Sequence, residues 1–178
     1  MKTLDKTGIS NEEKISKNYS YQPDLTLILD GLNKDFDQNI INAIVLWKVN
    51  RYVNLSEDVL ASINKIDKND TEIDVELTTK ILRKLLDTKG IRLAMASTIL
   101  RFKNPNIYQI IDQRVYRFVY GEELKYSLND IDKQIKLYLC YLKMLKSKSK
   151  EYNFDFKNAD RILYEMDKEY NKELKIKY

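Results

Sequence analysis

Histidine is absent from this chain, and cysteine occurs once, at Cys140. The lack of histidine excludes Ser-His-Asp and Cys-His catalysis, and every metal site that needs an imidazole ligand. One cysteine excludes an intramolecular disulfide and any zinc or iron–sulfur site made only of cysteines. A general acid or base must therefore be Asp, Glu, Lys, Tyr or Cys140. The sequence predicts neither a metal site nor a cofactor.

Glycine and proline are also scarce, with four and two residues in a chain of 178. Apolar residues recur at helical spacing, and strand-like alternation is lacking. We therefore expect an all-α fold. No apolar run approaches the roughly 20 residues that cross a bilayer, and the opening MKTLDKTG lacks the hydrophobic region of a signal peptide. The sequence thus predicts a cytoplasmic protein with no membrane partner.

Positive charge exceeds negative charge by a small margin, with 31 Lys and Arg against 27 Asp and Glu. The formal net charge of +4 and the isoelectric point near 8.9 are compatible with an anionic partner. The excess is mild for a dedicated DNA-binding protein, and ordinary solubility explains it equally well.

The most apolar helix is expected over residues 37–53, and we predict that it is central to the core. Its apolar stripe comprises Ile40, Ile41, Ile44, Val45, Leu46, Val49 and Tyr52.

The segment 85–119 has a distinctive order of parts. An apolar helix stops at Gly90, another begins near Arg92, and the chain breaks at Asn104-Pro105 before Asp112 opens a third helix. Gly90 permits the positive φ that a tight turn between helices needs. The start of the second helix offers backbone N–H groups to a phosphate oxygen. A plain helical hairpin with a glycine stop is the alternative.

Asp112 also has two interpretations. It is either the N-cap of its own helix or a carboxylate that faces a sugar as C1′ gains positive charge. Arg114 and Arg117 lie three residues apart on that helix. They either contact phosphates or serve as solvated or ion-paired groups.

Together these residues resemble the helix-hairpin-helix DNA glycosylase superfamily. Its pattern is Gly-Φ-Gly-x-Lys-Thr-Ala, followed by Val-Asp-Thr-His-Φ-x-Arg. Here GIRLAMAS and IIDQRVYR occupy the two motifs. Gly90, Ala96, Asp112 and Arg117 match family positions, and the interval from Ala94, at the position of the family's lysine, to Asp112 also agrees. The specific match covers about 30 residues.

The resemblance implies a two-lobed helical bundle over residues 1–178, with a helix-hairpin-helix motif at 82–102. One lobe spans about 23–120, and residues 1–22 and 121–178 combine in the other. The implied partner is duplex DNA with a flipped base, and the implied catalytic residue is Asp112. The implied phosphate-binding residues are Gly90, Ile91, Arg92, Arg114 and Arg117.

Two departures from the family pattern bear on mechanism. Ala94 replaces the lysine that forms a Schiff base, so the resemblance implies a monofunctional N-glycosylase of base-excision repair without lyase activity. Arg92 replaces the second hairpin glycine, so either the guanidinium contacts the phosphate in place of the backbone or the hairpin has lost this contact.

An extruded base needs an aromatic ring on which to stack. Trp47, Tyr52 and Tyr108 are the candidates, although Trp47 on an apolar helix is more often a core residue. The alternatives to a glycosylase are a non-catalytic helix-hairpin-helix DNA-binding protein and an unrelated helical scaffold. The sequence specifies neither the base nor the oligomeric state.

Overall fold

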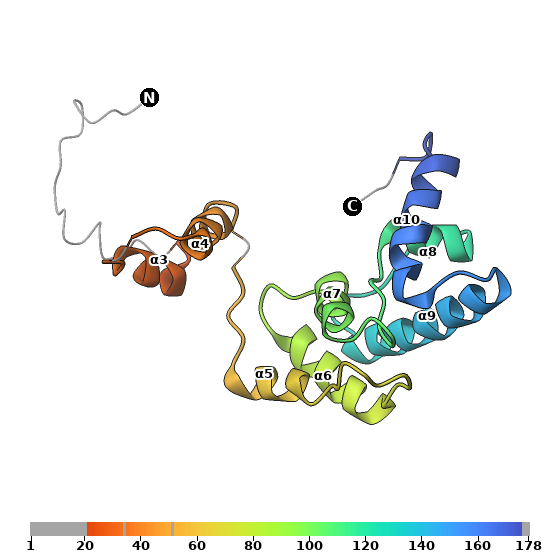
Figure 1. The fold of residues 1–178 in the computed structure, drawn as a ribbon, viewed down its shortest axis with the longest axis horizontal. Coiled ribbons are helices and arrows are strands. Elements are labelled where there is room, and N and C mark those ends of the chain that lie inside the picture. The colour runs from red at the N-terminus through yellow and green to blue at the C-terminus, as the bar shows by residue number, and fades with distance from the viewer. Residues whose placement is uncertain (1–20, 34, 51, 176–178) are drawn as a thin grey trace. The chain divides into compact units, whose positions relative to one another are not determined.

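A computed structural model describes residues 21–33, 35–50 and 52–175 (Figure 1). Every regular element in these ranges is a helix, which confirms the all-α prediction. The elements are α3 (Pro23–Asp30), α4 (Gln38–Lys48), α5 (Glu57–Asn64), α6 (Val75–Asp87), α7 (Leu93–Lys103), α8 (Gln113–Tyr120), α9 (Ile131–Glu151), the 3₁₀ helix η1 (Phe156–Asn158) and α10 (Ala159–Tyr170).

Short polar side chains set the starts of most helices. In α4, α6, α8 and α9 an aspartate precedes the first helical residue and accepts a backbone N–H of the first turn. Ser56 does the same for α5. Each of these caps satisfies a donor that the helix itself leaves unpaired.

The chain separates into two compact units, residues 1–54 and 55–178. This boundary lies elsewhere than the lobe limits expected from the family resemblance, because helices on both sides of residue 120 belong to the larger unit. The expected pairing of residues 1–22 with 121–178 stays a prediction, because residues 1–20 lie outside the described ranges.

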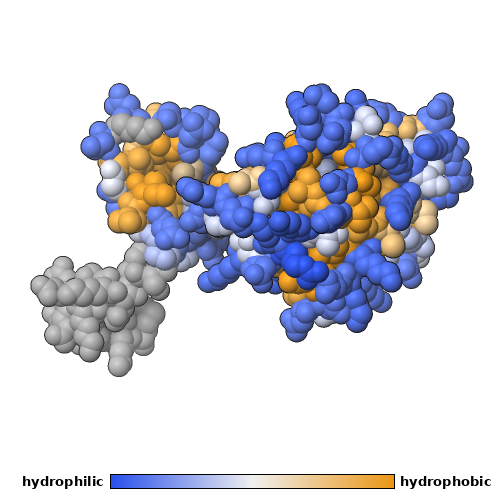
Figure 2. Space-filling view, turned by 90° about the horizontal axis from the view of Figure 1, so that it is seen from below, coloured by the Kyte–Doolittle hydropathy of each residue, from blue (hydrophilic) through white to orange (hydrophobic). Residues whose placement is uncertain are grey.

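In the smaller unit, α3 packs on α4. The prediction that the apolar stripe of residues 37–53 is central to the core is wrong: Ile40 is the buried member of the stripe, whereas Ile41, Val45, Leu46 and Val49 are exposed. The reason is that α3 is the other described helix of this unit, and one helix covers one face of α4. Figure 2 shows apolar side chains gathered on the surface of this unit.

The larger unit holds the main core. Helix α9 packs on α6, α6 also packs on α5 and α7, and α8 packs on α10. The fully buried aliphatic residues come from α6, α7, α9 and the segment before α8, and they include Ile81, Leu82, Leu85, Leu93, Leu100, Ile111 and Leu145. The helices on both sides of the α6–α7 turn and the segment before α8 therefore contribute to one common core.

Candidate functional site

The turn between α6 and α7 has the conformation that the sequence predicts. Gly90 has a φ of +90°, in the range that favours glycine. Ile91 is buried, and its N–H donates to the Thr88 carbonyl at 3.1 Å. Arg92 precedes α7, is exposed, and makes no side-chain capping bond. The side chain of Ile91 thus anchors the turn, while Arg92 remains at the surface.

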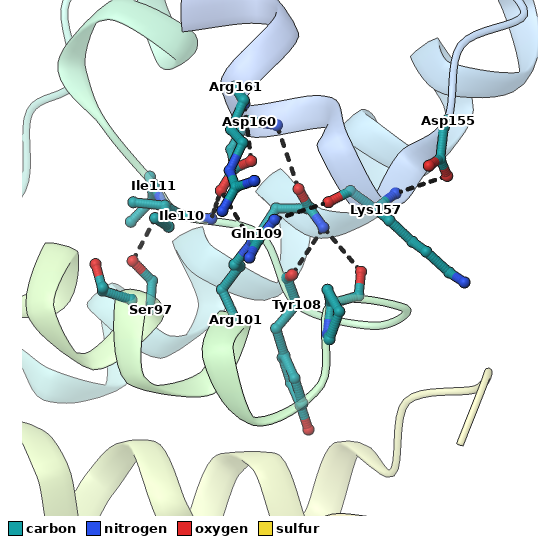
Figure 3. A network of polar contacts seen from close by, with 12 residues as sticks. Ser97, Arg101, Tyr108, Gln109, Ile110, Ile111, Asp155, Lys157, Asp160 and Arg161 are labelled. Atoms are coloured by element: carbon teal, nitrogen blue, oxygen red, sulfur yellow. Dashed lines mark hydrogen bonds and ion pairs between the residues drawn. The ribbon is translucent and has the colours of Figure 1, made fainter. Parts of the chain in front are cut away.

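The first turn of α7 is joined to the chain just before Asp112 by one side chain. The Ser97 hydroxyl donates to the Ala94 carbonyl at 2.7 Å and accepts the Ile111 N–H at 3.1 Å. Ala94, at the position of the family's lysine, is exposed and carries no amine. The two motifs, separated in sequence, are therefore adjacent in space (Figure 3).

Two buried tyrosines of α9 hold the carbonyl groups of the segment before Asp112. The Tyr138 hydroxyl donates to the Gln109 carbonyl at 2.9 Å, and the Tyr141 hydroxyl donates to the Ile110 carbonyl at 2.6 Å. Burial raises the pKa of both hydroxyls well above the ordinary value. They consequently stay protonated and serve as donors.

An aspartate of α10 holds the same segment from its other side. Asp160 Oδ2 accepts the Ile110 N–H at 3.2 Å, and the Asp160 N–H donates to Gln109 Oε1 at 3.2 Å. The buried Arg101 places its Nε 3.6 Å from Asp160 Oδ2 and donates through a terminal nitrogen to the Lys157 carbonyl at 3.1 Å. Ser97 of α7 and Asp160 of α10 (Figure 3), together with Tyr138 and Tyr141 of α9, fix the backbone that leads to Asp112.

Asp112 follows this segment and caps α8. Its Oδ1 accepts the Arg114 N–H at 2.7 Å. From the residues that the structure describes, no hydrogen bond reaches Oδ2, and the side chain is half-buried. Capping therefore engages Oδ1 of Asp112, and Oδ2 makes no hydrogen bond to a described residue.

An open hollow of about 480 Å³ lies beside this carboxylate. We call it the Asp112 hollow, and it is lined by Ile110, Asp112, Val115, Asp160, Arg161, Tyr164 and Glu165. The volume is within the range of about 300–1,000 Å³ that small-molecule sites occupy. Its apolar residues, its aromatic ring and its few charged groups match the usual composition of such sites.

Arg114 and Arg117 bind an internal carboxylate. Arg117 Nε lies 2.7 Å from Asp167 Oδ1, and an Arg117 terminal nitrogen lies 2.8 Å from Oδ2. Arg114 reaches the same Oδ2 at 3.2 Å. The Asp167 side chain is completely buried. These contacts correspond to the ion-paired alternative for the two arginines and not to phosphate binding.

Asp160 and Asp167 are not among the residues predicted above, although the sequence contains a signal for them. Both are buried on α10, and Leu163 is buried between them. The spacing of three and four residues is that of one helix face. Acidic residues at apolar positions of a helix indicate internal partners, because an unpaired carboxylate there is costly to bury.

The three aromatic candidates for base stacking are not among the residues that line the Asp112 hollow. Trp47 and Tyr52 belong to the smaller unit, where the Trp47 indole donates to Thr26 at 2.8 Å. Tyr108 is 2% exposed and its hydroxyl lies 2.7 Å from Thr78 Oγ1, so its ring offers no surface to an extruded base. The aromatic residue that lines the Asp112 hollow is Tyr164.

Within the described ranges, no helix has both the length and the apolar character to cross a bilayer, and no cluster of acidic or cysteine side chains has the arrangement of a metal site. Comparison with models of known protein families, with curated proteins and with solved structures finds no match to this chain. The contacts described above are therefore the basis for assigning a function.

Proposed function

We propose that this protein binds DNA through the α6–α7 hairpin and acts as a monofunctional N-glycosylase of base-excision repair on a damaged or modified base. The observation that carries the proposal is the junction at Ser97. It joins the first turn of α7 to the residue before Asp112, and Asp112 keeps one carboxylate oxygen beside an open hollow.

The hairpin supplies the means to hold a phosphate. At the start of α7 the Arg92 side chain makes no capping bond, so the first backbone N–H groups have no side-chain acceptor. Such a helix start attracts a phosphate oxygen without reading a base. The exposed Arg92 guanidinium adds a charge next to it.

The chemistry follows from the carboxylate. An extruded nucleotide in the Asp112 hollow would present C1′ to Asp112, whose negative charge stabilises the oxocarbenium character that develops as the base departs. The base departs with the electrons of the C1′–N bond, water forms the new C1′–O bond, and the proton that the water loses neutralises the departed base. Because Ala94 has no amine, no imine forms at that position, and the strand stays intact at the resulting abasic site.

A non-catalytic DNA-binding module is the second candidate, and specific contacts favour it. Asp112 already serves α8 as its N-cap, and Arg114 and Arg117 are held by Asp167. In such a module the hairpin would bind the backbone, and Asp112 would serve only to start its helix.

Replacing Asp112 by asparagine separates the two candidates. Asparagine caps a helix about as well as aspartate, so the fold is retained while the charge is lost. We expect release of a base from duplexes that carry single lesions to fall by about 100-fold or more, as for loss of one transition-state electrostatic contact. Strand cleavage after alkali measures the abasic product.

Asp74→Asn is the matched control, because Asp74 is likewise the N-cap of its helix, α6, where it accepts the Leu77 N–H at 2.9 Å, and does not line the Asp112 hollow. Binding without product over a broad lesion panel would favour the module. Absence of any DNA affinity at low salt would contradict both candidates, since phosphate contacts are strongest there.

A further inference from the structure

The charged groups of the Asp112 hollow differ in whether they already have a partner. The Asp160 carboxylate is buried against Arg101, and Glu165 pairs with Lys168 at 2.9 Å. Asp112 and Arg161 are the charged lining residues without an ion pair to any described residue. The hollow therefore presents one available carboxylate and one available guanidinium.

The backbone of Arg161 is held in place by a hydrogen bond. The backbone N–H of Arg161 donates to Asp160 Oδ1 at 2.8 Å, and the other oxygen of Asp160 accepts the backbone N–H of Ile110, two residues before Asp112. One carboxylate thus bridges the backbone of Arg161 and the segment that carries Asp112 (Figure 3). Arg161 itself is exposed, so its side chain can take a ligand.

We infer that Arg161 contacts the phosphate of the nucleotide whose sugar faces Asp112, so that the Asp112 hollow takes one nucleotide of a DNA strand. This inference rests on the proposed function. A nucleotide has a negative phosphate, a neutral sugar that turns cationic in the reaction, and a flat base. The guanidinium and the carboxylate complement the phosphate and the sugar, and the Tyr164 ring, which has Arg114 and Lys168 each 5.6 Å from its centroid, lines the space that remains for the base.

The salt dependence of binding tests the inference, because each neutralised phosphate contributes about −0.9 to the slope of log K against log salt. The probes are an intact duplex and the same duplex with one tetrahydrofuran abasic-site analogue, read by fluorescence anisotropy. We expect Arg161→Ala to reduce the slope by about 0.9 for the analogue duplex only. Arg161→Lys keeps the charge and should keep the slope.

Arg83→Ala is the matched control, because Arg83 is also an exposed arginine of a helix in the larger unit, and it is paired with Asp132 outside the hollow. A slope that Arg161→Ala leaves unchanged while the wild-type protein binds would overturn the inference and leave the proposed function standing. An equal reduction for both duplexes would also overturn it, since the contact would then lie outside the hollow. Failure of the wild-type protein to bind either duplex would instead contradict the proposed function itself.

Discussion

Asp167 is a buried carboxylate of α10 that is paired with two arginines of α8. Its side chain has no exposed surface, and Arg117, Arg114 and Asn171 all donate to it. Burial by itself would raise the pKa of this carboxyl, but these hydrogen bonds and the charge of Arg117 lower the pKa overall. The cluster ties α8 to α10, so Arg114 and Arg117 act on stability rather than on a ligand.

Asp167→Ala should therefore be costly. Removing one partner of a buried ion pair leaves the other charges uncompensated, and we expect the free energy of unfolding to fall by about 3 kcal/mol at pH 7. Asp132→Ala is the control, because the Asp132–Arg83 pair is exposed and should change stability by less than about 0.5 kcal/mol. Urea denaturation followed by circular dichroism measures both, and an equal effect of the two substitutions would contradict the assignment.

The same variant should respond differently to acid. A carboxyl whose folded pKa is below its ordinary value of 3.8 stabilises the folded state above that pH. This stabilisation is lost as the pH falls through 3.8 and then through the lower folded pKa. The wild-type protein should lose stability across this window more steeply than Asp167→Ala.

At the scale of the elements, the segment between α7 and α8 positions Asp112, and it has no regular secondary structure. The segment 104–112 connects α7 to α8. It begins with a turn in which the Tyr108 N–H donates to the Asn104 carbonyl at 3.1 Å, and the backbone near its end is paired with side chains of α7, α9 and α10. At the start of the segment, the side-chain amide of Asn104 donates to the carbonyls of Asp67 and Asp70 at 2.7 and 2.9 Å. At its end, the two tyrosines of α9 and Asp160 form hydrogen bonds with the backbone. Asp112 is therefore presented from a rigid support.

Tyr141→Phe tests this support. The substitution keeps the ring and removes the hydroxyl that donates to the Ile110 carbonyl, which leaves a partly buried acceptor unpaired. We expect the free energy of unfolding to fall by about 1 kcal/mol. Tyr116→Phe is the control, since Tyr116 is also buried but its hydroxyl bonds to no described residue. Equal melting temperatures of the two variants would contradict a supporting role for Tyr141.

At the scale of the whole molecule, the two units differ in how well they bury their apolar residues. Among the described residues of the smaller unit, the exposed large apolar side chains outnumber the buried ones, Leu25 and Ile40. Small folded units bury a smaller fraction of their surface than large ones and are correspondingly less stable. The larger unit, by contrast, has a continuous core from α5 to α10.

We expect the units to unfold separately. Backbone amides of α3 and α4 should exchange with deuterium much faster than those of α6, α7 and α9, because opening the smaller unit exposes little additional apolar surface. Hydrogen exchange read by mass spectrometry measures this, and a chain that begins at Leu55 should keep the exchange pattern of the larger unit. Uniform protection throughout the described helices would contradict this separation.

Local features of this protein are readable in its sequence. Four features depend on residues within a few positions of one another. They are the all-α character, the Gly90 turn, the end of α7 before Asn104-Pro105 and the capping position of Asp112. Backbone preference and capping act over that range, so a short stretch of sequence contains all that they need.

Only the tertiary structure decided which side chains meet. Arg117 and Asp167 are 50 residues apart, and the sequence offers many other acids to either arginine. Arg161 borders the hollow of Asp112 because α10 packs on α8. Most of the α4 stripe is exposed because, among the described residues of its unit, α3 alone packs on α4. Burial and ion pairing depend on which distant helices come together, and periodicity within one helix does not encode its partner.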